Sequence, residues 1–147
     1  MRWLLFFIGG FGLTGGAVAQ LDTIRMASFG GPAEDAGLHV LSLGEGDALV
    51  SGYTDSNDLA TREPWAVRLD SNLQVVWQHV VPLEMGGAAL GSILLPDGSV
   101  VIVSRELLSG AEGYGVRWDR LNAETGDGLG HDAWVQEGWI LPHGIHR

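Results

Sequence analysis

Apolar residues in this chain come in short runs separated by clusters of Gly, Asp, Asn, Ser and Pro. From Leu21 onward no stretch keeps the i, i+3, i+4, i+7 spacing of an amphipathic helix over three turns, and the short apolar runs are typical of strands. Between them lie turn signals such as Pro96-Asp97-Gly98. The pattern predicts an all-β chain. The expected strands are 23–29, 38–43, 48–53, 65–69, 75–81, 88–94, 100–105, 115–118 and 133–136.

The strand pattern repeats along the chain. Leu41–Val50 aligns with Ile93–Ile102 at an offset of 52 residues, and each copy reads as strand, Gly-containing turn and strand. Trp65–Asp70 and Tyr114–Asp119 share the order aromatic, any residue, Val, Arg, apolar, Asp, here at an offset of 49. A period of about fifty residues with about four strands in each unit is the size of a propeller blade.

These repeats support a resemblance. The segment 46–78 resembles the blades of bacterial β-propeller repeat proteins, and 119–134 is similar to the tryptophan-docking motif of pyrroloquinoline-quinone-type propellers through Ala123, Thr125-Gly126 and Trp134. The resemblance covers about residues 22–136. It implies antiparallel four-stranded blades and an incomplete propeller of about two blades plus the leading strand 23–29, whereas closed propellers have at least about four blades.

The resemblance also implies roles for the tryptophans and two departures from the family pattern. Trp77 and Trp134 are expected to pack between blades, because large rings bury much apolar area where sheets meet. Trp65 and Trp118 fit core packing and an aromatic platform for carbohydrate equally well. Leu73 stands where the family pattern has Gly, and residues 128–131 stretch the second motif, which predicts a longer hairpin loop there.

The N-terminal segment has the three parts of a secretory signal peptide. Met1-Arg2 supplies positive charge, Trp3–Phe11 an apolar run and Ala17-Val18-Ala19 a small-residue cleavage site. The apolar run is shorter than the ~20 residues that span a bilayer, which argues against an anchor. The sequence thus predicts a signal peptide (1–19), a β-propeller-type repeat segment (20–136) and an irregular tail (137–147), in a secreted or periplasmic protein.

Composition excludes several partners and chemistries. The chain holds 18 acidic and 8 basic residues, for a net charge of −10. Nucleic acid and anionic membrane surfaces demand clustered positive charge, so neither is an expected partner. The absence of cysteine excludes disulfides, a thiol nucleophile and a lipid-modified N-terminus. Stability must therefore come from packing.

No motif reaches the specificity of a catalytic or metal site. Asp127–Trp134 partly matches a calcium-binding nonapeptide but occurs once, and a Gly-rich turn explains it better. Asp55–Asp58 lacks the Gly and Glu of an EF-hand. His131, His143 and His146 lack a helix that would place them together. We therefore predict no catalytic residue, no cofactor and no metal.

The expected function is that of an exported, non-enzymatic scaffold or binding module for an unidentified protein or glycan. Self-association through exposed strand edges is a further expectation. The alternative is an N-terminal fragment of a larger propeller enzyme, such as a quinoprotein-like dehydrogenase, in which the missing blades would carry the cofactor residues. The abrupt 137–147 segment favours a truncated gene.

Cleavage after Ala19 makes Gln20 the first residue of the exported chain. Loss of Arg2 with the leader then moves the net charge from −10 to −11. N-terminal sequencing of the secreted or periplasmic protein should read Gln-Leu-Asp-Thr. A chain that still begins at Met1 would contradict the cleavage.

Overall fold

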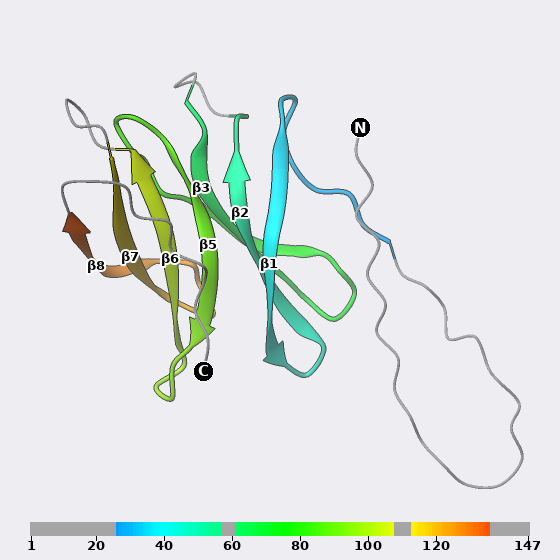
Figure 1. The fold of residues 1–147 in the computed structure, drawn as a ribbon. Coiled ribbons are helices and arrows are strands. Elements are labelled where there is room, and N and C mark those ends of the chain that lie inside the picture. The colour runs from blue at the N-terminus through cyan, green and yellow to red at the C-terminus, as the bar shows by residue number, and fades with distance from the viewer. Residues whose placement is uncertain (1–25, 57–60, 108–112, 136–147) are drawn as a thin grey trace, which may run out of the picture.

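A computed structural model describes residues 26–56, 61–107 and 113–135, which form two four-stranded antiparallel sheets (Figure 1). The first sheet consists of β1 (Asp35–Gly44), β2 (Asp47–Thr54), β3 (Glu63–Leu69) and β4 (Val75–Val80). The second consists of β5 (Gly87–Leu94), β6 (Ser99–Leu107), β7 (Tyr114–Asn122) and β8 (Gly128–Val135). Both sheets follow chain order, and the predicted fold class, all-β with antiparallel four-stranded sheets, is confirmed. The two sheets do not close into a ring.

The part of the chain that the structure describes contains no helix. It therefore offers no helical segment long and apolar enough to cross a membrane. The predicted leader and tail, 1–19 and 137–147, lie outside the described residues.

Two predicted features of the secondary structure are wrong. Residues 26–29, the described part of the expected leading strand 23–29, are not a strand; Phe29 instead packs against the first sheet, with its ring 5.9 Å from that of Trp65. The placement of the longer hairpin loop at 128–131 is also wrong, because Gly128 already pairs with Leu121 and these residues begin β8. The hairpin loop itself is longer, since the turn between β7 and β8 holds one residue more than the turn between β3 and β4. The remaining expected strands coincide with β1 to β7 within a few residues.

The strand register makes the two sheets equivalent at one offset. Leu49 pairs with Arg68 in the first sheet, and Val101 pairs with Arg120 in the second, which is a shift of 52 in both strands. Even the irregularity in β1 between 37 and 39 recurs in β5 between 89 and 91. The alignment of Trp65–Asp70 with Tyr114–Asp119 at an offset of 49 is therefore wrong, since hydrogen-bonded pairing and not local similarity defines equivalence.

The fourth strands, β4 and β8, are offset by 53 residues, because the turn between β7 and β8 holds one more residue than the turn between β3 and β4. Asp70 Oδ1 accepts the backbone N–H groups of Asn72 and Gln74, each at 2.8 Å. Asn122 Oδ1 accepts those of Glu124 at 2.8 Å and Thr125 at 3.2 Å. These side chains fix the turns, as Asp and Asn commonly do. Trp77 lies opposite Arg68, and its equivalent opposite Arg120 is Gly130.

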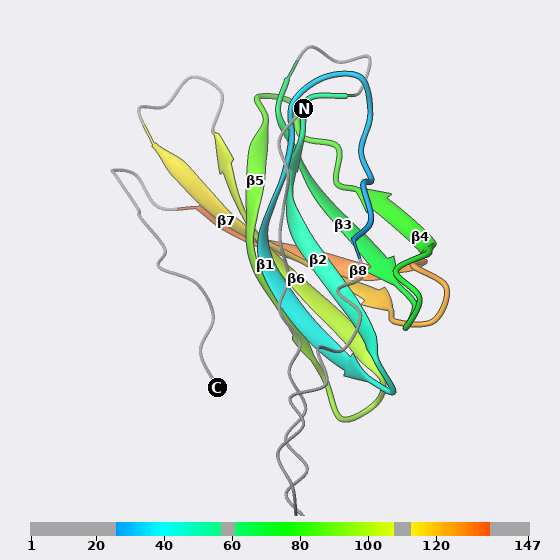
Figure 2. The ribbon, with the colours of Figure 1, turned by 90° about the vertical axis from the view of Figure 1, so that its right-hand side faces the viewer.

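The main hydrophobic core lies between the two sheets. Strand β5 faces β1, β2 and β3, so the second sheet stands against one face of the first (Figures 1 and 2). The buried residues of this core come from both sheets: Leu49, Ala66, Trp77, Ala89, Val100, Ile102, Leu121 and Ala123. A second cluster covers the opposite face of the first sheet, where Phe29 and Leu73 pack on Val50, Trp65, Val67 and Leu69.

Truncation of the central core should be costly. Leu121 is 1% exposed in the core between the sheets, so Leu121→Ala should lower the free energy of unfolding by about 2–5 kcal/mol through lost burial and a cavity. Leu129→Ala, at a side chain that is 54% exposed, is the matched control and should stay within about 0.5 kcal/mol. Urea unfolding followed by circular dichroism measures both. Equal losses would contradict the assignment of the core.

Candidate functional site

The two sheets are joined through the indole of Trp77. Its Nε1 donates a hydrogen bond to the carbonyl oxygen of Ala123 at 3.0 Å, so the buried ring leaves no polar atom unpaired. The ring lies directly against Gly126, where an added Cβ would come within 2.7 Å of Trp77 Cδ2. Gly126 also has a φ of 77°, a conformation that favours glycine. The turn of the second sheet is thus shaped to receive the tryptophan of the first.

Arg68 reinforces the same contact. Its Nη1 donates to the Ala123 carbonyl oxygen at 2.8 Å and to Glu124 Oε2 at 2.7 Å, while its Nη2 donates to Asp47 Oδ2 at 2.8 Å. The hydrogen bond to the Asp47 carboxylate raises the pKa of Arg68, and the Glu124 carboxylate adds to this. The Ala123 carbonyl therefore accepts from two side chains of the neighbouring sheet. The sequence showed an arginine in each repeat but not this role.

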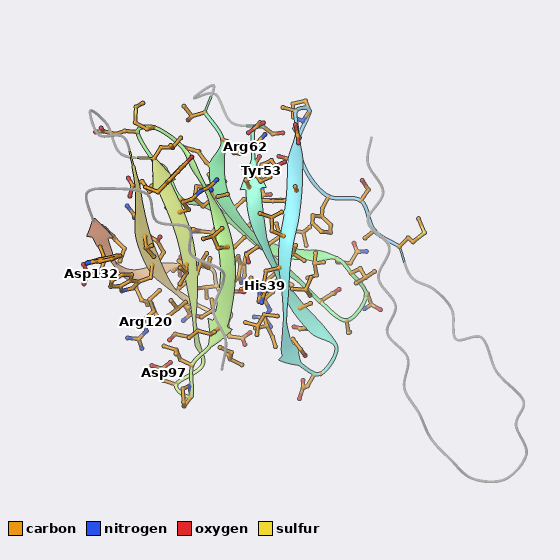
Figure 3. All side chains as sticks on the ribbon, viewed as in Figure 1. His39, Tyr53, Arg62, Asp97, Arg120 and Asp132 are labelled. Carbon is orange, nitrogen blue, oxygen red and sulfur yellow. The ribbon has the colours of Figure 1, made fainter. Side chains whose placement is uncertain are left out.

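A first groove runs between the edge strands β1 and β5. It has a volume of about 300 Å³ and is lined by residues 39–42 and 92–94. His39 Nδ1 lies 3.2 Å from Ser92 Oγ and forms a hydrogen bond across the two sheets; Figure 3 labels His39 midway along β1. Ser92 is almost fully buried at the wall of this groove. The pair ties these two edge strands together.

A second groove, of about 290 Å³, lies between the outer parts of the sheets. His79 from β4 and His131 from β8 line it together with an ion pair on β7, in which Arg117 Nη2 lies 2.8 Å from Asp119 Oδ1. The hydrogen bond to Asp119 raises the pKa of Arg117. Both charged groups are largely buried and neutralise one another, as buried charges generally require.

A polar cluster lies at one end of the first sheet, where Figure 3 labels Tyr53 and Arg62. The Tyr53 hydroxyl donates to Glu34 Oε1 at 2.7 Å, and this hydrogen bond raises the pKa of the phenol. The Arg62 guanidinium lies 3.8 Å from the centre of the Tyr53 ring and pairs with Asp55 Oδ1 at 3.2 Å. These groups satisfy one another and hold the segment before β1 against the first sheet.

The second sheet has one face that no other described element covers. We call this uncovered surface the outgoing face of the second sheet. The outgoing face of the first sheet is the equivalent surface, and it is buried against the second sheet. Pairing places its residues on one side of β6, β7 and β8: Val101, Val103, Trp118, Arg120, Asp132 and Trp134. Trp118 is 36% and Trp134 49% exposed.

The outgoing face also carries charged groups. Arg120 donates through Nε to Ser99 Oγ at 2.9 Å and pairs through Nη2 with Asp97. Figure 3 shows Asp97 and Arg120 together near one end of the second sheet, with Asp132 further along it. Asp132 lies directly across from Trp118 in the pairing of β7 with β8. Aromatic and hydrogen-bonding groups therefore alternate on this face.

The structure separates the two tryptophans that the sequence grouped together. Trp77 is buried between the sheets, whereas Trp134 is half exposed and stands at the position that Val81 occupies in the first repeat. Trp65 is buried on the other face of the first sheet, and Trp118 is exposed. A blade-packing role for Trp134 stays a prediction.

The weaker motifs fall into ordinary structure where the structure describes them. The calcium-like segment Asp127–Trp134 lies largely within β8, and His131 faces the second groove. His143, His146 and half of the Asp55–Asp58 loop lie outside the described residues. Among the residues that are described, no three His, Cys, Asp or Glu side chains are grouped to hold a metal ion.

Comparison with known proteins adds no relative. No protein-family model matches the chain, and no curated protein sequence matches it significantly. The argument for a function therefore rests on the geometry of the two sheets and their surfaces.

Replacement of Trp77 should uncouple the sheets. Trp77→Ala removes a buried ring and leaves its hydrogen-bond acceptor to Arg68 alone, so the free energy of unfolding should fall by about 3–5 kcal/mol. Trp134→Ala, which removes the same side chain from an exposed position, should cost less than about 1 kcal/mol. Thermal and urea unfolding of both variants measures the difference. A smaller loss for Trp77→Ala than for Trp134→Ala would contradict the docking role.

Proposed function

We propose that the chain is an exported, non-enzymatic β-propeller-type repeat module that binds a protein or glycan partner outside the cytoplasm. The outgoing face of the second sheet is its binding surface. The two sheets form a rigid scaffold that holds this face in place. Function is argued from the surface and not from the fold, because unrelated activities share such folds.

The repeat geometry supports the propeller-type part of the proposal. Two sheets of the same strand order share one register, and a tryptophan of the first docks on a Gly-containing turn of the second. This is the arrangement that the resemblance implies for neighbouring blades. The incoming side of the first sheet is closed, since Phe29 and Leu73 cover its apolar residues. Such a cap is what terminal repeats need for solubility.

One observation carries the binding proposal. The outgoing face of the first sheet is buried in the core. The outgoing face of the second sheet instead exposes two tryptophans. Exposed aromatic residues on a rigid sheet supply contact area at low conformational cost, and such surfaces mark sites of interaction. The strong negative charge of the chain favours a neutral or basic partner.

The interior supports the non-enzymatic part. In the two grooves, Arg117 pairs with Asp119, and His39 bonds the buried Ser92. Neither arrangement sets an activated nucleophile beside an exposed base, which is what covalent catalysis uses. These grooves serve packing in our proposal.

A binding screen tests the proposal. The immobilised exported chain should bind at least one member of two panels, neutral oligosaccharides and exported proteins of the source cell, when followed by biolayer interferometry. The Trp118→Ala/Trp134→Ala double variant should lose that binding while keeping the melting temperature within a few degrees. Val76→Ala, an exposed apolar position on β4, is the matched control.

Two results would overturn it. The first is that no member of either panel binds, or that the double variant binds as well as the original chain. The second concerns the enzyme alternative. A stoichiometric absorbance change on addition of pyrroloquinoline quinone and calcium would show a cofactor site, and we expect none.

A further inference from the structure

The outgoing faces of the first and second sheets differ at two positions through which the first sheet packs on the second. Ala66, fully buried in the first sheet, has Trp118 as its equivalent in the second, by the shared 52-residue register. Trp77, which docks on the neighbouring sheet, has Gly130 as its equivalent. The second sheet thus lacks the docking tryptophan and carries a large ring where close packing required a methyl group.

These two differences exclude a further sheet packed in the same way. In the first sheet, the side chain of Ala66 lets the core residues of the second sheet come into contact. A tryptophan at that position would overfill such a core, and overpacking is destabilising. Without an indole at Gly130, no ring can seat on a neighbouring turn as Trp77 does on Gly126. The outgoing face of the second sheet therefore suits a different kind of occupant.

The two exposed tryptophans lie at the spacing of a small ligand. Trp118 pairs with Asp132, and Trp134 is two residues further along β8 on the same side. Such diagonal positions lie about 7–8 Å apart on one side of a sheet. Their exposed fractions, 36% and 49%, amount to roughly 200 Å² if a whole tryptophan exposes about 250 Å².

The polar groups next to the rings match a polyhydroxylated ligand. The Asp132 carboxylate, directly across from Trp118, can accept several hydrogen bonds. Arg120, two residues after Trp118 on the same side of β7, adds guanidinium donors to this face. Sugar rings present apolar C–H faces and a rim of hydroxyls, so an indole can cover the face while Asp132 and Arg120 bond the rim. The acidity of the chain disfavours an anionic polysaccharide. A neutral pyranose chain satisfies all these features.

We propose that the outgoing face of the second sheet binds a neutral glycan, with pyranose rings stacked on Trp118 and Trp134 and hydroxyl groups bonded to Asp132 and Arg120. This inference rests on the proposed binding function and specifies its ligand. Trp118 and Trp134 supply contact area, Asp132 orients the hydroxyls, and Asp97 with Ser99 holds the Arg120 side chain in place.

Isothermal titration calorimetry with four neutral hexasaccharides, of cellulose, mannan, xylan and chitin type, tests the proposal on the exported chain. At least one should bind. Trp118→Ala and Trp134→Ala should each weaken that binding at least about tenfold, Asp132→Ala should weaken it several-fold, and Val76→Ala should leave it unchanged. Trp118→Phe and Trp134→Phe should retain part of the affinity because a ring remains. Far-ultraviolet circular dichroism and the melting temperature confirm that each variant is folded.

The proposal fails if none of the four hexasaccharides binds, or if a folded Trp118→Ala/Trp134→Ala variant binds as tightly as the original chain. Its failure can be told apart from failure of the proposed function. A protein partner that needs the same two tryptophans, with no hexasaccharide bound, would leave the binding module standing and overturn the glycan.

Discussion

The structure depends on one contact, the seating of the Trp77 indole on the turn that contains Ala123 and Gly126. Each sheet alone would leave an apolar face in water. The indole covers part of both faces and satisfies its one polar atom, while Arg68 bonds the same carbonyl. Because shape, burial and hydrogen bonding coincide at this point, the contact selects one relative position of the two sheets.

The two sheets contribute different groups to this contact, so the outer faces of the two-sheet pair differ. The first sheet supplies the tryptophan and the second supplies the glycine turn. On the incoming side, the position equivalent to Gly126 is Leu73, with a φ of 62° that is uncommon for a residue with a side chain. Its side chain joins Phe29 in covering the first sheet. Among the residues that the structure describes, that side is covered, whereas the outgoing face of the second sheet is not.

The open face owes its chemistry to substitutions within an otherwise common register. A shared backbone lets single positions change role: a buried alanine becomes the exposed Trp118, and the docking tryptophan becomes Gly130. The arginine that pairs with Trp77 in the first sheet and with Gly130 in the second is retained. Arg68 bonds the second sheet, whereas Arg120 pairs within its own sheet. One scaffold thereby produces a packing surface on the first sheet and, in our proposal, a recognition surface on the second.

Alternation of apolar residues and Gly, Asp and Pro turns determined the all-β class and most strands, because these signals act over a few residues. The tertiary structure decided what depends on pairing. It extended the offset of 52, which the alignment of Leu41–Val50 with Ile93–Ile102 had given, to β3 and β7, where local similarity indicated 49. It also extended β8 through a glycine-rich segment and separated Trp77 from Trp134. Whether a tryptophan is buried or exposed depends on the strand register and on which face of the sheet a neighbouring sheet covers. The residues next to it in the sequence determine neither.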